Sequence, residues 1–204
     1  MLTMFANGCC GNVNHRNLAW TDPQKGAGEA RRCGLILAAA VARAFPALAP
    51  LTPAPIQASS ELVKLPLPEI TEADLARARE TLRRMKEAKA PFLDQVKCFQ
   101  TFDIQARNGE PYEVEVQVIA LGKDAAFVSL PGEMFVELGL AIKAASPFPH
   151  TYLIELANGA IGYIPTRNAY AEGNYEPVSA RCAAGSGELL VESALRQLKA
   201  LHGR

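Results

Sequence analysis

The chain has 204 residues, and 49% of them are hydrophobic. This is enough for one domain with a real core, or for one domain plus an appendage. The 21 Lys and Arg residues balance the 21 Asp and Glu residues, so the formal net charge is zero. We therefore expect no nucleic-acid partner, because binding to phosphate backbones needs a basic surface. No dense basic run favours an anionic membrane.

The first third of the chain predicts a strand, a loop and a helix. Leu2–Ala6 is typical of a short strand, and a polar loop rich in Gly and Asn follows from Asn7 to Gly28. A helix is predicted over Glu29–Phe45, where Pro46 ends it, and its mostly Ala, Leu, Ile and Val surface indicates burial on most sides. These elements form the first predicted part of the chain, residues 1–46.

The same region contains a segment that imitates an export signal. Arg31-Arg32 precede an apolar stretch, but Arg43 interrupts it, and the stretch is too short to span a membrane. Because the N-terminus also lacks a basic region followed by a long apolar one, we expect no signal peptide and no transmembrane segment. The localisation stays open.

Residues 47–110 are predicted to be a proline-rich linker followed by a charged helical insertion. Leu62–Leu67 is a plausible edge strand that prolines keep short. Thr71-Glu72-Ala73-Asp74 resembles a capping box and predicts a solvated surface helix to about Lys89. A further helix is predicted over Phe92–Ala106. The sequence leaves open whether this part is a lid or a plain surface insertion.

Residues 111–204 show the clearest periodicity in the chain. Three valines alternate with polar residues between Glu113 and Val118, which predicts a half-buried strand. A central strand over Ala125–Leu130, a strand over Tyr152–Leu156 and a final helix from Ser186 to Leu201 complete the pattern. We therefore predict a mixed α/β fold, with a central mixed sheet flanked by helices, as an incomplete domain.

Glu133 is the first candidate for chemistry. It follows Pro131 and Gly132 on a sharp turn, between the central strand and a helix predicted from Met134 to about Ala145. A carboxylate at such a junction lies at the mouth of a sheet, where metals and substrates bind. It fits metal ligation or general-base catalysis, and it equally fits an acidic residue that favours the helix dipole.

Three tyrosines lie in tight or polar segments downstream. Tyr163 stands in Gly162-Tyr163-Ile164-Pro165, and Tyr170 and Tyr175 stand in a long polar loop. A phenol in such a loop can donate a hydrogen bond to a developing oxyanion. Ordinary packing is the alternative for each. Tyrosine is an uncommon zinc ligand, so chemistry alone does not select Tyr163.

Cysteine and histidine give no metal signature of their own. The five cysteines are odd in number and contain no C-x-x-C pair, which argues against a zinc ribbon and a disulfide framework. The adjacent Cys9 and Cys10 fit two packed side chains better than a redox pair or a metal ligand. The three histidines, among them His15, form no H-x-H or H-E-x-x-H pattern.

Together these segments resemble the neutral/alkaline non-lysosomal ceramidase family, over roughly residues 1–46 and 110–201. The matching features in the C-terminal part are, in order, the strand into Pro131-Gly132-Glu133, the segment Gly162–Thr166, the Tyr170 loop and Asn174-Tyr175-Glu176. The segment from Phe5 through Asn14 resembles the glycine-rich Gly-Asp-Val-Ser-Pro-Asn loop of that family.

The resemblance implies a zinc-dependent amidase that hydrolyses the N-acyl amide of a sphingolipid-like substrate. It implies Glu133 and Tyr163 as zinc ligands and Tyr175 as the catalytic tyrosine near the scissile amide. Asn12, Asn14 and Tyr170 would contact the substrate. Asn12 and Asn14 replace the aspartate and serine of the family loop, and His15 replaces its proline.

The two zinc histidines of the family lie upstream of the glycine-rich loop, and this chain begins at that loop. We therefore expect a fragment that binds zinc weakly or not at all by itself and whose uncovered sheet self-associates. The alternative is a non-catalytic α/β module that kept the fold and lost the chemistry. A third hypothesis, a hydrolase using Cys9 or Cys10 with His15, needs both partners from one short loop.

Overall fold

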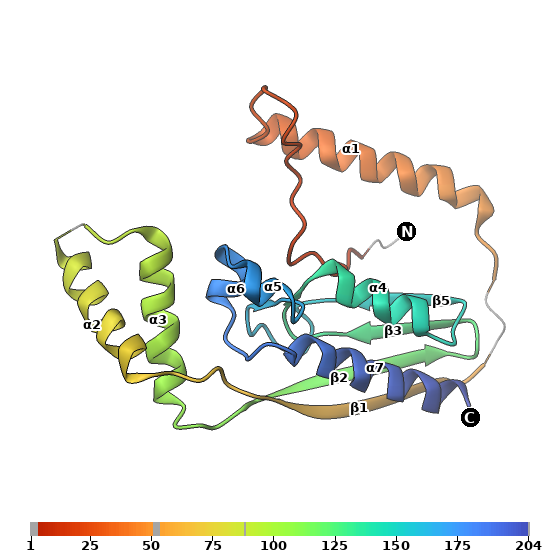
Figure 1. The fold of residues 1–204 in the computed structure, drawn as a ribbon. Coiled ribbons are helices and arrows are strands. Elements are labelled where there is room, and N and C mark those ends of the chain that lie inside the picture. The colour runs from red at the N-terminus through yellow and green to blue at the C-terminus, as the bar shows by residue number, and fades with distance from the viewer. Residues whose placement is uncertain (1–3, 51–53, 88, 204) are drawn as a thin grey trace. The chain divides into compact units, whose positions relative to one another are not determined.

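A computed structural model describes residues 4–50, 54–87 and 89–203 (Figure 1). Contacts divide the chain into two units, Met1–Val13 with Ala54–Arg204 and Asn14–Pro53. The three parts predicted from the sequence, 1–46, 47–110 and 111–204, differ from these units and stay a prediction.

The larger unit is built on a four-stranded mixed sheet of order β1-β2-β3-β5. Its strands are β1 (Ile56–Leu65), β2 (Tyr112–Leu121), β3 (Ala125–Ser129) and β5 (His150–Ile154). The β1–β2 and β2–β3 pairs are antiparallel, and the β3–β5 pair is parallel. The predicted mixed sheet is confirmed, and β3 is the central strand that the sequence indicates. The predicted edge strand exists, but it begins earlier in the chain and pairs along its whole length.

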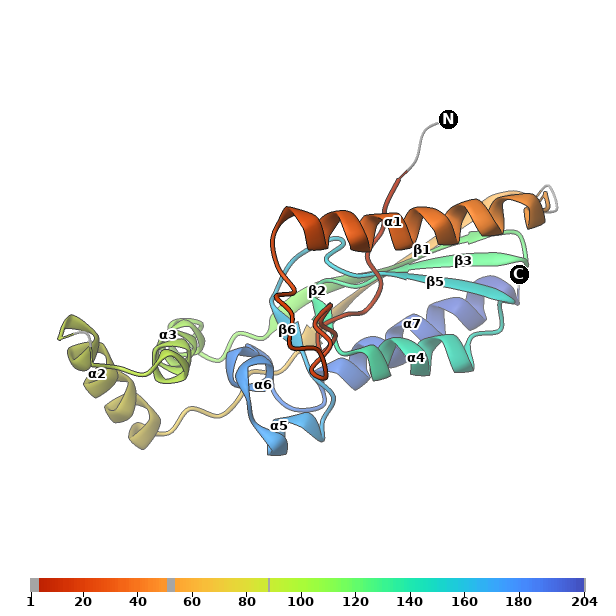
Figure 2. The same cartoon turned by 90° about the horizontal axis from the view of Figure 1, so that it is seen from above.

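Two helices cover one face of this sheet, as Figure 2 shows. They are α4 (Val136–Ala145) and α7 (Ser186–His202), and they contact each other. The alternating valines of β2 point toward them, and Val116 and Val118 are fully buried. Because strand side chains alternate between the two faces, this pattern places the hydrophobic core between the sheet and the two helices.

A smaller parallel pair lies beside the main sheet and forms the candidate site. Its strands are β4 (Glu133–Met134) and β6 (Tyr163–Ile164). The sequence predicted that the helix begins at Met134, but the backbone stays extended through Phe135 and α4 begins at Val136. The extension follows from pairing, because the amide N–H groups of Glu133 and Phe135 donate to the carbonyls of Gly162 and Ile164.

A helical hairpin, α2 (Glu72–Lys86) and α3 (Phe92–Ala106), connects β1 to β2. The predicted capping box is present, because Thr71 accepts from the Asp74 amide and Asp74 accepts from the Thr71 amide. The α2 helix is mostly exposed, as predicted, and it buries Leu75 and Ala78 on one side. The α3 helix packs against α2 and also contacts α6 (Tyr175–Ser179).

The smaller unit holds α1 (Ala27–Ala44), followed by the 3-10 turn Phe45–Ala47. The helix itself is confirmed, but its predicted burial is wrong, because α1 has no buried residue. An alanine-rich surface fits helix formation without burial. A strand was predicted over Leu2–Ala6. The structure describes Met4–Ala6, which form no strand, and the first two residues of the predicted strand lie outside the described residues.

Candidate functional site

Glu133 and Tyr163 are direct partners in the β4–β6 pair. Both residues are half-buried, and the residues that follow them, Met134 and Ile164, are fully buried. Gly132 makes the pairing sterically feasible, because a Cβ there would lie 2.6 Å from the Gly162 carbonyl oxygen. The two residues implied as zinc ligands are thus brought side by side by backbone pairing.

The Tyr163 phenol is held protonated by its surroundings. Partial burial is the largest cause that raises its pKa to about 12, and the charge of Glu133 and a hydrogen bond to its carboxylate follow. The interaction between Glu133 and Tyr163 therefore involves the side chains as well as the backbone. A carboxylate and a phenol thus lie next to each other, and both are partly exposed.

Tyr175 lies next to this pair at the start of α6. Its ring packs edge-on against the Tyr163 ring, with centroids 5.7 Å apart. The same ring stacks on Phe92 from the start of α3, with centroids 5.8 Å apart. The structure thus brings the predicted catalytic tyrosine to the predicted metal ligands, and it adds Phe92, which the sequence did not single out.

Tyr170 has a different environment. It belongs to α5 (Ala169–Glu172), and its hydroxyl donates to the Cys182 carbonyl oxygen at 2.8 Å. Burial raises the pKa of this phenol. The contact fits a packing tyrosine, and the predicted substrate-binding role of Tyr170 stays a prediction.

Asn12 connects the glycine-rich loop to α4. Its Oδ1 accepts from the Val136 amide at 2.8 Å, and its Nδ2 donates to the Glu137 carboxylate at 2.8 Å. Gly11 lies so close to β4 that a Cβ there would be 2.3 Å from the Glu133 carbonyl oxygen. The loop therefore contacts the backbone of Glu133, while the Asn12 side chain is engaged by the first turn of α4.

Glu155 is a buried carboxylate that the sequence analysis missed. Its side chain is 3% exposed and accepts hydrogen bonds from Asn7, Cys10 and Met134. The signal was present in the sequence, because Glu155 follows the apolar Leu153 at a spacing of two, and alternation along an extended segment places both side chains on the same face. Glu155 ties the glycine-rich loop to β4.

No family model and no curated protein matches the chain. Among solved structures, the neutral ceramidase from Pseudomonas aeruginosa is similar over 98% of this chain, with a TM-score of 0.65 and 20% sequence identity. The chain has the fold of a neutral ceramidase segment. It spans 37% of the length of that ceramidase. A ceramidase complexed with C2 matches 45% of this chain and 15% of its own, with 24% identity and a TM-score of 0.41.

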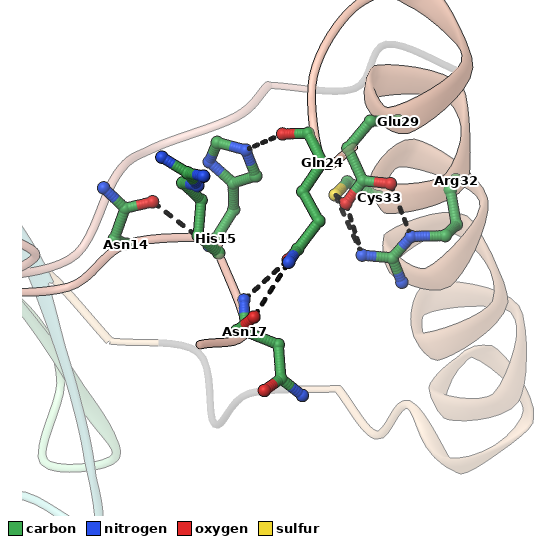
Figure 3. Close-up of polar contacts among 8 residues, drawn as sticks. Asn14, His15, Asn17, Gln24, Glu29, Arg32 and Cys33 are labelled. Carbon is green, nitrogen blue, oxygen red and sulfur yellow. Dashed lines mark hydrogen bonds and ion pairs between the residues drawn. The ribbon is translucent and has the colours of Figure 1, made fainter. Parts of the chain in front are cut away.

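This ceramidase-like fold confirms the fold that the resemblance implied, and it leaves the individual roles of the site residues as predictions. Asn14 and His15 belong to the smaller unit (Figure 3). The Asn14 carbonyl oxygen Oδ1 accepts from the Arg16 amide at 3.1 Å, and His15 Nε2 lies 3.0 Å from the Gln24 carbonyl oxygen. These contacts are local to the loop before α1.

The thiols of Cys9 and Cys10 in the larger unit are poorly suited to nucleophilic attack. Burial and the charge of Glu155 raise the pKa of Cys9 to about 12. Burial and the Glu155 hydrogen bond also raise the pKa of Cys10. A nucleophilic cysteine needs a lowered pKa, so the hypothesis of a cysteine hydrolase loses its chemical basis. Cys9 instead packs against Gly139 and Leu153, as the interpretation of packed side chains predicted.

The fit of this site to zinc can be tested from its donors. A carboxylate and a phenol supply two oxygen ligands, and zinc sites in proteins usually have three or four protein ligands. In the parts of the chain that the structure describes, no group of three His, Cys, Asp or Glu side chains could hold a metal ion. Glu133 and Tyr163 could therefore supply two oxygen donors, fewer than a zinc site needs.

Proposed function

We propose that this chain carries one half of the active site of a zinc-dependent, ceramidase-like amidase. The observation that carries the proposal is the direct pairing of Glu133 with Tyr163, with Tyr175 packed on Tyr163, within a ceramidase-like fold. The family resemblance assigns these three positions to two zinc ligands and one catalytic tyrosine. Two histidines from a segment upstream of the glycine-rich loop would complete the metal site.

Each residue has a defined part in this proposal. Bound zinc would supply a Lewis acid and an activated water for attack on an amide carbonyl. Glu133 would hold the metal with its carboxylate, and Tyr163 would hold it with its phenolic oxygen. Tyr175 donates its phenolic proton in a hydrogen bond to the oxyanion that develops on the carbonyl. Its exposed fraction of 38% leaves part of the ring open to a substrate.

The proposed substrate is the N-acyl amide of a sphingolipid-like molecule. The similar solved structure is a neutral ceramidase. The family resemblance implies hydrolysis of the N-acyl amide bond. An exposed apolar side chain beside Tyr175 supports an apolar substrate, because Phe92 stacks on Tyr175 and is 66% exposed. No described helix is long and apolar enough to cross a membrane.

The test uses the whole open reading frame that contains this chain. We expect the purified product to hold zinc and to release the fatty acid from a fluorescent N-acylsphingosine. Glu133→Ala should weaken zinc binding at least about tenfold, because a four-ligand site loses its only carboxylate. Elemental analysis during competition with a chelator measures this loss. Tyr175→Phe should lower kcat and leave the zinc content unchanged.

Glu172→Ala is the matched control, because Glu172 is an exposed carboxylate on α5 that is not among the proposed ligands. Its zinc content and activity should equal those of the unsubstituted protein. If Glu133→Ala binds zinc as tightly as the control, the ligand assignment is wrong.

The alternative function is a non-catalytic α/β module. The hydrogen bonds of the Asn12 side chain to Val136 and Glu137 favour this alternative. Asn12 replaces a loop aspartate of the family, and its side chain is engaged by α4. A module of this kind should unfold cooperatively, and its melting temperature should be the same with zinc and with a chelator. Zinc-dependent stabilisation of the whole-frame protein that disappears in Glu133→Ala contradicts this alternative.

A further inference from the structure

The Glu155 side chain has the most side-chain hydrogen bonds of the buried polar residues that the structure describes in the larger unit. Its Oε1 accepts from Asn7 Nδ2 at 3.0 Å and from the Cys10 thiol at 2.7 Å. Its Oε2 accepts from the backbone amides of Cys10 and Met134, both at 3.1 Å. The Glu155 amide in turn donates to the Asn7 carbonyl oxygen at 3.0 Å.

These contacts join three segments that are far apart in sequence. Asn7 and Cys10 belong to the glycine-rich loop, Met134 to β4, and Glu155 follows the end of β5. A second link runs in parallel, because the Gly11 amide donates to the Met134 carbonyl oxygen at 2.8 Å. The backbone of Met134 is therefore fixed from both sides by groups outside its own strand pair.

Burying a carboxylate to make such a connection costs desolvation free energy. Burial disfavours an ionised carboxylate unless hydrogen bonds compensate, and no ion pair of Glu155 is found among the described residues. Four neutral donors replace its lost hydration. A glutamine amide would replace it poorly, because it has one accepting oxygen for four donors and its NH2 group would face Asn7 Nδ2. The donor arrangement selects a carboxylate.

We propose that Glu155 is the positioning residue of the Glu133–Tyr163 pair. It holds the glycine-rich loop against β4 and thereby fixes the backbone of Met134 beside Glu133. Glu133 then stays in register with Tyr163, and its carboxylate stays beside the phenol. The role of the Glu133–Tyr163 pair in metal binding rests on the proposed function. The hydrogen bonds that position the pair exist without metal.

The test is made on this chain without metal, so that its outcome is independent of zinc binding. Glu155→Gln is compared with Glu172→Gln, an exposed matched control, and with Glu133→Gln, which reports the loss of the Glu133 charge beside Tyr163. Nuclear magnetic resonance measures amide exchange at Cys10, Met134 and the buried Leu198 of α7, and it follows the Tyr163 ring resonances.

We expect Glu155→Gln to speed amide exchange at Cys10 and Met134 by about tenfold or more, since the four donors are then left with one accepting oxygen, which is neutral and accepts more weakly than a carboxylate. Exchange at Leu198 should stay unchanged. The Tyr163 ring resonances should move toward those of Glu133→Gln, whereas Glu172→Gln should leave all of them at wild-type values. A shift of the Tyr163 ring toward its position in Glu133→Gln, with exchange at Leu198 unchanged, distinguishes a positioning role of Glu155 from a general loss of stability.

Two results overturn the proposal. One is an unchanged Tyr163 ring in Glu155→Gln, and the other is exchange that rises equally at Leu198, which indicates global loss of stability. Should Glu155→Gln fail to fold, Cys10→Ala removes one donor and keeps the carboxylate, with Cys33→Ala in the other unit as its control. It should speed exchange at Met134 a few-fold and shift the Tyr163 ring, and no change in either measurement overturns the proposal.

Discussion

Glu133 and Tyr163 face each other across a strand pair only two residues long. The Glu133 amide donates to the Gly162 carbonyl oxygen at 2.9 Å, and the side chains of the two partners interact as well. A carboxylate and a phenol are thus held together by backbone hydrogen bonds on both sides. This relationship is the part of the candidate site that is most directly open to measurement.

Glu133→Gln should lower the pKa of Tyr163 from about 12, because the negative charge of Glu133 disappears and a neutral amide oxygen accepts more weakly than a carboxylate. It should stay above the ordinary tyrosine value, since burial is the largest cause of the shift and remains. Ultraviolet absorbance of tyrosinate during a pH titration measures the pKa of Tyr163. A Tyr163→Phe protein, titrated in the same way, identifies which part of the signal belongs to Tyr163. An unchanged Tyr163 titration would show that the two side chains do not interact.

The same shift predicts how stability depends on pH. The folded-state pKa of Tyr163 is raised above the ordinary value of 10.0, so the protonated phenol stabilises the folded state fully below pH 10. This contribution is lost as the pH rises through about 12. Urea unfolding of wild type and Tyr163→Phe across this range measures it, and Tyr163→Phe should lose less stability. Parallel curves for the two proteins would contradict the prediction.

Phe92→Ala should loosen Tyr175. The two rings stack at 5.8 Å, and such pairs contribute about 1 kcal/mol beyond the area they bury. We expect a small loss of unfolding free energy and greater mobility of the Tyr175 ring, measured by relaxation of labelled tyrosine. Phe99→Ala is the control, because Phe99 is a similarly exposed phenylalanine of the same helix. Equal ring mobility in both variants would mean that Phe92 does not restrain Tyr175.

Gly11→Ala should destabilise the larger unit by about 1–3 kcal/mol, because the added Cβ would lie 2.3 Å from the Glu133 carbonyl oxygen. The loop or β4 must then move. Gly34→Ala in α1 meets open space and should increase helix stability by about 1 kcal/mol. Chemical denaturation measures the first effect and helical circular dichroism the second. A Gly11→Ala protein as stable as wild type would mean that the loop does not lie against β4.

Thr71→Ala should cost about 1 kcal/mol of unfolding free energy, since the Thr71 hydroxyl accepts from the Asp74 amide at the start of α2. Thr71→Ser keeps the hydroxyl and should recover most of the loss. Denaturation of the three proteins under the same conditions gives the comparison. If the serine variant is as unstable as the alanine variant, the capping hydrogen bond is not the cause.

Much of the fold could be predicted because its signals are local. Alternation of valines with polar residues specified β2, and the Thr71–Asp74 capping box specified the start of α2. The turn before Glu133 was also visible in the sequence. The burial of α1 was predicted wrongly, because an alanine-rich surface is compatible with both a buried and an exposed helix. The start of α4 was misplaced by two residues of extended backbone.

By itself the sequence determined the order of the four strands of the main sheet and of the longer helices, the mixed α/β class and the presence of a carboxylate and tyrosines in turns. These depend on side-chain periodicity and turn residues within short windows. Only the tertiary structure decided that Glu133 pairs with Tyr163, that Phe92 stacks on Tyr175 and that Glu155 is buried between the loop and β4. These relationships need hydrogen bonds and packing between segments far apart in the chain, and no local pattern encodes which segments will meet.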